Sequence, residues 1–584
     1  KMMAIPYFGR IDFQEKGQPE VLPLYIGIHS FFNPPTNENL IHDWRAPISS
    51  MFYDYELGEA HFDAPSGEVK GNIRLKRQYR IRDGKMEFML ESSLNIQDDI
   101  QKELIGNSDD RMKNIVATIQ REQNKIIRND TSNTLIIQGV AGSGKTSIAL
   151  HRVAYLLYRH KGEITSNDIL IISPNKVFAD YISNVLPELG EEKIEECGFE
   201  ELMLKILDNK YKIQTFFDQV AEILDKEEED FIERIRFKST TEFIQQMDKY
   251  ILYLEQNAFR PTDLKAGRIP IPAEYLKERF AAWHRLPMRS RFQPMAEEIA
   301  RELTFTYHQE PMGKIQIRQL GNELKKMFNN KDLDLYKGFY DWLGKPEMFK
   351  QGKNRKLEYA DVAPLLYLKL ALEDNKTMYG IKHLLVDEMQ DYTPIQYKVL
   401  AKLFPCRKTI LGDAKQSVNP YSSTTCEQIQ RVLVGSEVMK LCKSYRSTYE
   451  ITEFAQRIAK NEELEAIERH GEEPAVALLP TEKKEIEWIE NLITSFLKGA
   501  DVSMGIICKT VKQADKLYAA INHLSDKICL LTEESVAFVN GVVITTAHMA
   551  KGLEFDEVIV PFVTDKNYRT EIDRSMLYVA CTRA

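Results

Sequence analysis

The residues best suited to chemistry form a glycine-rich run that ends in a lysine and a threonine. Residues 139–146 read Gly-Val-Ala-Gly-Ser-Gly-Lys-Thr and fit the pattern G-x-x-x-x-G-K-[ST] in full. Glycines let backbone N–H groups converge on phosphate oxygens, and a helix that begins there adds positive potential. We therefore expect Lys145 to reach the β- and γ-phosphates of a nucleotide and Thr146 to ligate Mg²⁺. The candidate nucleotide-binding residues of this run are Gly139, Gly142, Ser143, Gly144, Lys145, Thr146 and Ser147.

A pair of adjacent carboxylates follows an apolar run further along the chain. Residues 384–386 are Leu-Leu-Val, and Asp387 and Glu388 come next. At the carboxyl end of a strand in an open α/β sheet, both carboxylates would lie where such sheets bind ligands. We expect Asp387 to hold Mg²⁺ and Glu388 to activate an attacking water. Alone, this pattern is also typical of an ordinary buried strand, and the upstream phosphate loop favours the functional interpretation.

Strands and helices that alternate must position these residues. A strand, the glycine loop, a helix through Tyr158 and a second strand form the order typical of a parallel α/β sheet. A helix is expected over residues 113–128. Strands of this first lobe are predicted at 135–137, 169–172, 383–386 and 409–411, and those of a second lobe at 475–479, 504–508, 528–531, 542–545 and 558–560.

Length and composition predict four parts. The 584 residues suffice for about four domains. Residues 1–105 read as a β-rich module with a hairpin at 73–90 and a partly buried Trp44. We expect a first lobe over 106–190 and 356–435, a helical, acidic insertion over 191–355, and a second lobe over 436–584 that is cut short at its C-terminal end.

The net charge of −9 is concentrated in one window of the insertion. Residues 191–230, the acidic window, contain 14 Asp or Glu and 5 Lys or Arg, so the other 544 residues sum to zero. An acidic chain argues against a simple nucleic-acid binder. A second stretch, 279–292, combines four arginines with three aromatic residues, and we favour a packing role for it over contact with nucleic acid.

Cysteine usage and hydropathy indicate the compartment. The seven cysteines are scattered without a C-x-x-C pair, which predicts neither a disulfide framework nor a zinc site. No apolar run approaches the roughly 18 residues of a membrane span, and no signal peptide is visible. We expect a cytoplasmic protein without a membrane partner, leave its oligomeric state open with a monomer favoured, and interpret the ends at Lys1 and Ala584 as those of a fragment.

Further segments, in order along the chain, resemble motifs of the UvrD/Rep branch of superfamily 1 helicases. These are 120–123 (QREQ), 173–175 (SPN), 412–417 (GDAKQS), 444–448 (SYRST), 546–555 (TAHMAKGLEF) and 577–584 (LYVACTRA). The resemblance implies an α/β fold with two RecA-like lobes that bind ATP and Mg²⁺ between them. It also implies roles for site residues: Gln123 reads adenine, Gln416 senses the γ-phosphate, Tyr445 stacks on adenine, Arg446 contacts the γ-phosphate, Glu554 binds the ribose, and Arg583 completes the site. Gly552, in the same motif as Glu554, is a further nucleotide-binding residue.

Three departures argue against an ordinary DNA-unwinding enzyme of that branch. Only 100 residues separate Arg446 from Thr546, where UvrD-type helicases carry a large extra subdomain. The family's aromatic-rich run after GDxxQS is replaced by residues 418–422, in which Tyr421 is the aromatic residue left for base stacking. The insertion is acidic where a strand-binding subdomain should be basic.

Segments of the β-rich module look like the HelD branch, the RNA-polymerase-associated helicase-like ATPases. They are 6–12 (PYFGRID), 25–27 (YIG), 43–50 (DWRAPISS) and 76–79 (KRQY). This resemblance implies a motor that binds bacterial RNA polymerase, releases bound nucleic acid and recycles the enzyme, with nucleic acid itself as a further contact. We also expect the acidic window to lie on an arm that competes with nucleic acid for a basic channel.

Two alternative functions stay open at this point. The first is a UvrD/Rep-like DNA helicase or translocase in repair, which the short 446–546 interval and the acidic insertion argue against. The second is a nucleotide-gated binding protein with little turnover. Glu388 argues against it, because a pure binder needs no catalytic carboxylate.

Overall fold

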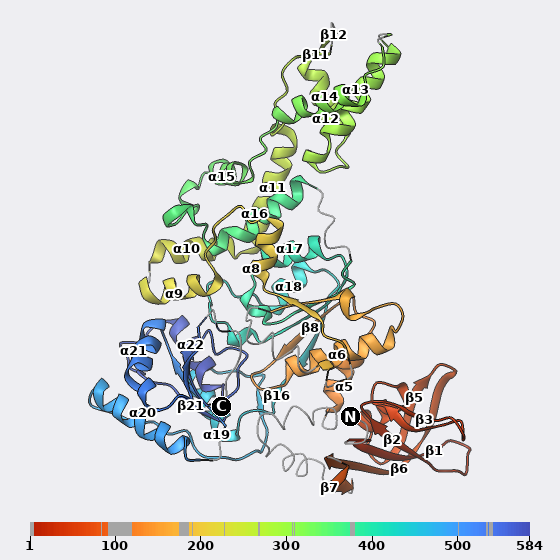
Figure 1. The fold of residues 1–584 in the computed structure, drawn as a ribbon, viewed down its shortest axis with the longest axis vertical. Coiled ribbons are helices and arrows are strands. Elements are labelled where there is room, and N and C mark those ends of the chain that lie inside the picture. The colour runs from red at the N-terminus through yellow and green to blue at the C-terminus, as the bar shows by residue number, and fades with distance from the viewer. Residues whose placement is uncertain are drawn as a thin grey trace.

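The computed structural model describes residues 5–82, 84–91, 119–173, 186–187, 189, 191–226, 228–266, 269–306, 308, 310–373, 380–499, 502–532, 535 and 541–584. Figure 1 shows an elongated molecule with a helical arm at one end and two α/β lobes and a β-rich module at the other. The chain is therefore a mixed α/β protein, as the motifs predicted. In the described ranges, every helix is too short or too polar to cross a membrane.

The N-terminal module is a mostly antiparallel sheet in the order β3-β4-β2-β1-β6-β5, with β7 paired to β6. The expected hairpin is present, because β6 and β7 pair in antiparallel register from Arg82↔Lys85 to Arg77↔Glu91. Its turn residue Asp83 lies outside the described residues. The elements are β1 (Gly9–Glu15), β2 (Leu22–Gly27), β3 (Phe31–Asn33), β4 (Glu38–Asp43), α1 (Ser50–Asp54), β5 (Gly58–Ala64), β6 (Gly67–Arg82) and β7 (Lys85–Glu91).

Trp44 joins this module to the first lobe. The expectation of a partly buried tryptophan is wrong, because Trp44 is 0% exposed. Its ring meets the ring of His151 edge-on, with centroids 5.6 Å apart. Arg128 donates to the carbonyl oxygens of Trp44 (2.7 Å) and Arg45 (3.0 Å). The module and the lobe thus share one hydrophobic core.

The first lobe is built on a parallel six-stranded sheet in the order β10-β9-β13-β14-β8-β15. Two of the boundaries expected for the first lobe differ from those of the structure. β10 pairs with β9 although it lies in the acidic window, and β15 pairs with β8 although it lies beyond residue 435. The elements are α5 (Arg121–Arg128), β8 (Thr134–Gly139), α6 (Lys145–Arg159), β9 (Ile169–Ile172), β10 (Glu195–Cys197), α16 (Tyr359–Leu372), β13 (His383–Val386), α17 (Pro394–Leu403), β14 (Arg407–Gly412), α18 (Cys426–Val432) and β15 (Glu437–Leu441). Of the helix expected over 113–128, residues 113–118 lie outside the described ranges.

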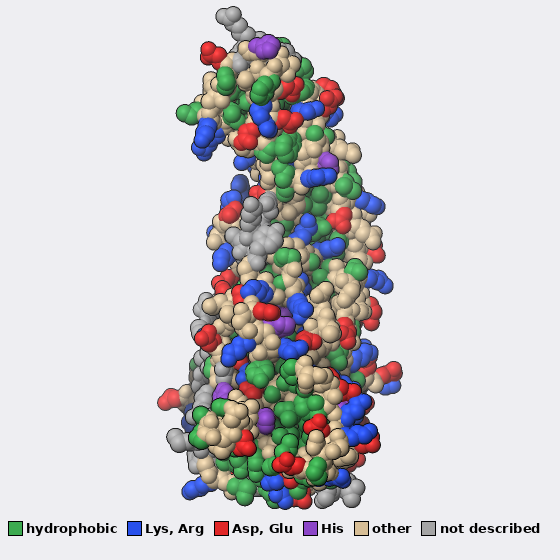
Figure 2. Space-filling model, turned by 90° about the vertical axis from the view of Figure 1, so that its right-hand side faces the viewer, with side chains coloured by type: hydrophobic (Ala, Val, Ile, Leu, Met, Phe, Trp, Pro, Cys, Tyr) green, Lys and Arg blue, Asp and Glu red, His purple; other side chains and the backbone are tan. Residues whose placement is uncertain are grey.

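The helical insertion has a base and a projecting arm (Figure 1). The base comprises α8 (Phe199–Ile206), α9 (Phe216–Lys226) and α10 (Glu229–Lys238). The arm, residues 241–343, comprises α11 (Thr241–Asn257), β11 (Leu264–Ala266), β12 (Ile269–Ile271), α12 (Ala273–Ala282), α13 (Phe292–Thr306), α14 (Lys314–Lys326) and α15 (Asp332–Leu343). On the face shown in Figure 2, acidic and basic side chains are interspersed along the arm.

The acidic window does not lie on the arm, so that expectation is wrong. Its described residues form β10, α8, α9 and the start of α10, all at the base of the insertion. The physical reason is that α9 buries Phe216, Val220 and Ile223 in the main hydrophobic core, which draws this helix onto the lobes. Of the acidic side chains, Glu227 lies outside the described residues.

The basic and aromatic stretch packs the arm, as expected. Phe280 and Phe292 are buried, and their rings stack with centroids 5.7 Å apart. Arg291 is 2% exposed, lies over the Phe280 ring and donates to the carbonyl oxygen of Leu286 (2.8 Å). The aromatic residues of this stretch therefore build a core.

The second lobe has a parallel four-stranded sheet in the order β19-β20-β18-β21. Four of the five expected strands are present, and the strand expected at 475–479 is absent. Residues 471–479 have no regular secondary structure, and the side chain of Leu478 is 94% exposed because no described strand pairs with this segment. The elements are β16 (Lys443–Ser444), α19 (Tyr449–Ile458), β17 (Glu465–Ala466), α20 (Glu482–Phe496), β18 (Ser503–Cys508), α21 (Val511–Ile521), β19 (Ile528–Leu530), β20 (Gly541–Thr546), β21 (Glu557–Ile559) and α22 (Glu571–Cys581).

We predict that Trp44→Ala destabilises the protein by about 3–5 kcal/mol, because it opens a cavity in the core shared by the module and the first lobe. Urea unfolding followed by circular dichroism measures this loss. Trp488→Ala, at a tryptophan that is 37% exposed, is the matched control and should cost far less. Equal losses in both variants would contradict the shared core.

Candidate active site

The phosphate loop connects β8 to α6. Gly142 and Gly144 adopt left-handed conformations with φ of 72° and 74°, which side chains other than glycine rarely take. A Cβ on Gly142 would lie 2.6 Å from Ser444 Oγ, so the loop also needs glycine to fit against the next segment of the site. Lys145 is the first residue of α6 and Thr146 the second. This arrangement is the strand, loop and helix that the motif predicted.

Asp387 and Glu388 follow β13 at the carboxyl end of the first-lobe sheet. The Glu388 backbone N–H donates to Asp387 Oδ1 (2.8 Å). Asp387 Oδ2 is buried and has no hydrogen-bond partner in the described part of the chain. Glu388 has a φ of 54°, a conformation that costs a non-glycine residue of order 1–3 kcal/mol and is frequent at functional sites.

The charges around these carboxylates favour a cation at Asp387. Burial and the adjacent Glu388 charge raise the pKa of Asp387. Burial also opposes the charge of Glu388, but the cations of Lys551 and Lys145 outweigh it and lower the pKa of Glu388. The free, buried Asp387 Oδ2 and the Thr146 hydroxyl at the start of α6 are oxygen donors of the kind that Mg²⁺ prefers. The residues present therefore fit Mg²⁺.

A chain of amides links the carboxylates to the second lobe. Gln390 Nε2 donates to Glu388 Oε2 (2.7 Å), and Gln390 Oε1 accepts from the Asp413 N–H (3.0 Å). Gln416 Nε2 donates to Asp413 Oδ2 (2.9 Å), and Gln416 Oε1 accepts from Arg583. Sequence reasoning assigned no role to Gln390. The signal that could have found it is a glutamine two residues after the pair of carboxylates at the end of a strand.

Two arginines reach the centre, Arg446 from the segment that follows β16 and Arg583 from the residues just after α22. Arg446 forms an ion pair with Glu554, and its positive charge acts on the Lys145 ammonium group. Arg583 is 2% exposed, and burial, together with the charge of Arg446, lowers the pKa of Arg583 to about 10. The Tyr445 N–H donates to the Gly142 carbonyl oxygen (2.9 Å) and so ties this segment to the phosphate loop.

Several residues expected at the nucleotide have other partners in this structure. Glu554, expected at the ribose, pairs with Arg446. Gln123 is buried on α5, where its Oε1 accepts from the Gln120 N–H (3.0 Å) and caps the helix. The Ser147 hydroxyl lies 3.3 Å from His151 Nδ1, inside α6.

The remaining expected residues are placed as follows. Tyr445 is half-buried, and burial raises the pKa of its hydroxyl to about 12. Gly552 has a φ of 86° in the turn after Lys551. Gly139 ends β8, and a Cβ there would lie 2.5 Å from the buried Ser143 Oγ. Pro174 and Asn175 of the expected strand-touching motif lie outside the described residues.

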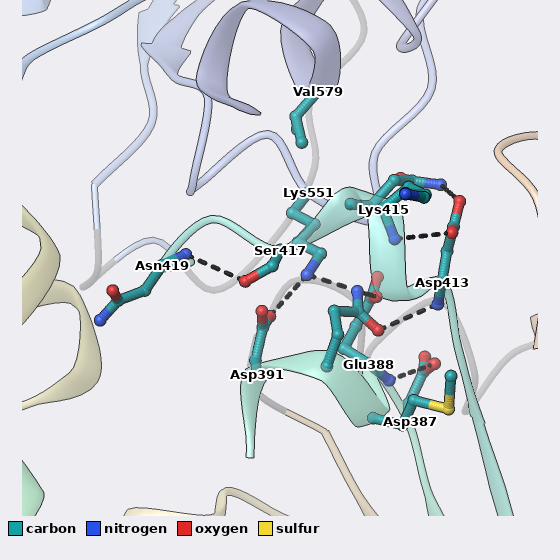
Figure 3. Close-up of polar contacts among 12 residues, drawn as sticks. Asp387, Glu388, Asp391, Asp413, Lys415, Ser417, Asn419, Lys551 and Val579 are labelled. Atoms are coloured by element: carbon teal, nitrogen blue, oxygen red, sulfur yellow. Dashed lines mark hydrogen bonds and ion pairs between the residues drawn. The ribbon is translucent and has the colours of Figure 1, made fainter. Parts of the chain in front are cut away.

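Lys551 crosses from the second lobe to the carboxylates of the first. Its Nζ lies 2.6 Å from Asp391 Oδ2 and 3.5 Å from Glu388 Oε2. Figure 3 shows the Lys551 side chain pointing between these two carboxylates. Lys551 lies within the 546–555 motif, but the sequence alone does not assign it to the site, because its partners Asp391 and Glu388 lie 160 and 163 residues away.

Family models match three stretches of the chain. Residues 119–433 match the UvrD/REP helicase N-terminal domain, residues 1–107 the N-terminal domain of DNA helicase IV HelD, and residues 541–584 the UvrD-like helicase C-terminal domain. The first match alone covers more than half of the chain.

Individual relatives are similar over shorter stretches. The ATP-dependent DNA helicase srs2 of Schizosaccharomyces pombe is 30% identical over 149 residues, which cover 24% of this chain and 17% of the relative. A putative ATP-dependent DNA helicase of Acanthamoeba polyphaga mimivirus is 25% identical over 280 residues, which cover 40% of this chain and 38% of the relative. The chain thus spans well under half the length of these two relatives.

A solved structure is also similar in sequence over a limited stretch. It is the C-terminal domain of a possible DNA helicase from Lactobacillus plantarum WCFS1, with 30% identity and a TM-score of 0.21 over 24% of this chain and 82% of that one.

The three family models, in their order along the chain, identify the family. The chain belongs to the UvrD/REP family of superfamily 1 helicases, which are ATP-dependent, and it carries a HelD-type N-terminal domain.

Proposed function

We propose that this protein is an ATP-hydrolysing motor that binds bacterial RNA polymerase in the cytoplasm, releases bound nucleic acid and so recycles the enzyme. The hydrolytic half of the proposal rests on one observation. Glu388 of the first lobe lies in the same charged cluster as Lys145 of the phosphate loop and Arg583 of the second lobe. This is the set of groups that phosphoryl transfer to water requires.

The chemistry follows from these positions. A water held by Glu388 attacks the γ-phosphorus and passes a proton to the Glu388 carboxylate. The bond from the γ-phosphorus to the bridging oxygen breaks, and ADP leaves with that oxygen. Lys145 binds the phosphates, and Gln416 senses the γ-phosphate. When bound to Thr146 and Asp387, Mg²⁺ supplies positive charge that neutralises the phosphate oxygens.

The two arginines make hydrolysis depend on contact between the lobes. Arg446 and Arg583 would stabilise the charge that develops on the phosphoryl oxygens, a contribution of about 10³–10⁵ in rate for an arginine finger. Arg446 pairs with Glu554, and Arg583 donates to Gln416. Binding of ATP between the lobes would direct both arginines to phosphate oxygens, so that binding and release move one lobe against the other.

We predict that Glu388→Gln lowers kcat for ATP hydrolysis by about 10²- to 10⁴-fold, because the general base is lost while the side-chain volume is kept. Nucleotide affinity should stay unchanged, whereas Lys145→Ala should weaken it by about ten- to a hundredfold. Phosphate release and titration with a fluorescent ATP analogue measure the two effects. Glu487→Gln, on the exposed face of α20, is the control. Normal turnover in Glu388→Gln would remove Glu388 from its role.

Three features support polymerase as the partner. The HelD-type N-terminal match covers residues 1–107. The arm projects from the first lobe and is suited to enter a cavity of a larger assembly (Figure 1). Tyr421, the residue left to stack on a base, lies under the guanidinium of Arg236 at 4.5 Å from the ring centroid and is already engaged by the insertion.

The names of the relatives favour a second candidate, a DNA helicase or translocase, since both are ATP-dependent DNA helicases. The arm offers a way to separate the two functions. The arm tip comprises residues 260–327. The chain segments that lead into and out of it lie side by side, because Phe259 and Phe328 form an antiparallel bridge. The Arg260 N–H also donates to the Met327 carbonyl oxygen (3.0 Å).

We predict that replacing residues 260–327 with a Gly-Ser turn, with Phe259→Ser and Phe328→Ser, reduces co-purification of bacterial RNA polymerase by at least about tenfold. Basal ATP turnover should persist, because the catalytic cluster lies in the lobes. The measurement is a pull-down with purified core polymerase, next to ATPase assays with and without single-stranded DNA. Strong stimulation by single-stranded DNA without polymerase binding would favour the helicase instead.

A further inference from the structure

The candidate site holds three carboxylates within five residues. Asp387, Glu388 and Asp391 are all buried, at 1%, 9% and 5% exposure. Charges of the same sign so close together in a region of low dielectric destabilise one another unless cations compensate them. Lys145 supplies one cation from the phosphate loop of the same lobe. The second is Lys551, which comes from the other lobe.

Lys551 is placed to act on Glu388 and not merely to fill space. Its side chain is 5% exposed, and its Nζ lies between Asp391 (2.6 Å) and Glu388 (3.5 Å), as Figure 3 shows. Glu388 also accepts a hydrogen bond from Gln390 on the same oxygen, Oε2. Both polar contacts therefore fall on one side of the carboxylate, which leaves Oε1 to receive a proton from water.

The turn that carries Lys551 touches the insertion as well as the first lobe. We call residues 546–551 the bridging turn. The N–H groups of Met549 and Ala550 donate to the Thr546 carbonyl oxygen, at 3.1 and 2.8 Å, which makes the turn compact. The ring of His548 lies against the ring of Phe217 on α9, with centroids 5.7 Å apart. The base of the insertion thus packs on the turn that presents Lys551.

We propose that Lys551 is a positioning residue for hydrolysis, which holds the Glu388 carboxylate from the opposite lobe while Phe217 keeps the bridging turn seated. The base is then oriented toward water only when the second lobe and the insertion are in place. A movement of the insertion caused by a bound partner is transmitted to Glu388 through His548 and Lys551. This inference rests on the proposed ATP hydrolysis and deepens it.

The test compares Lys551→Met with Lys551→Arg. Loss of the ammonium group should lower kcat for ATP hydrolysis by about 10- to 100-fold. This is less than the loss expected when the general base itself is removed, because Glu388 is still present. KM and the affinity for a fluorescent ATP analogue should change by less than about threefold, because Lys551 is assigned no contact with the nucleotide. Arginine keeps the charge and should restore kcat to within about fivefold of the unaltered protein.

The matched control is Lys516→Met, which removes another lysine of the second lobe that pairs with a glutamate. Its partner is Glu482, and the lysine side chain is 61% exposed, so turnover should not change. Thermal unfolding of every variant shows whether the fold is kept. Phe217→Ala, which leaves Lys551 intact, should lower kcat by about three- to tenfold with the same unchanged KM.

The outcomes separate the two proposals. If Glu388→Gln is inactive but folded Lys551→Met turns over ATP at the normal rate, the positioning role is overturned and the proposed hydrolysis stands. If Glu388→Gln turns over normally, the assignment of the base itself is wrong, and the role of Lys551 falls with it. An equal loss in Lys551→Met and Lys551→Arg, or a loss that appears only in KM, also contradicts the positioning role.

Discussion

The arrangement of this protein depends on compensating the negative charge at the carboxyl end of β13. A parallel sheet brings Asp387 and Glu388 to its edge, and the following turn adds Asp391. No single element supplies enough positive charge for three buried carboxylates. The cations come from α6 and from the bridging turn, which belong to different lobes. Contact between the lobes is therefore part of the electrostatics of the site.

The same dependence explains why the neighbouring amide and charged groups form a chain of hydrogen bonds. Gln390 ties Glu388 to the backbone of Asp413, and Gln416 ties Asp413 to Arg583. A buried polar network of this kind is stable only when its members are satisfied. Glu554 and Gln416 hold the two arginines, Arg446 and Arg583, in place.

The N-terminal module and the insertion are attached to the elements that carry Lys145 and Lys551. Trp44 packs on α6, the helix that begins with Lys145, and Phe217 packs on the bridging turn that ends with Lys551. Each attachment joins one peripheral part to one of the two lobes. A partner that binds the module or the arm can therefore act on the site through packed side chains, without touching the nucleotide.

The sequence by itself determined the parts of the site that are local. The spacing of residues 139–146 requires a strand, a tight turn and a helix, and an apolar run that ends in Asp387 and Glu388 requires the edge of a sheet. The strand expected at 475–479 was wrong because alternation of apolar residues does not show whether a neighbouring strand exists. The acidic window was misplaced because net charge does not reveal the apolar face of α9. Lys551 and Phe217 could be assigned only from the tertiary structure, because their roles depend on contacts between residues that lie far apart in the chain.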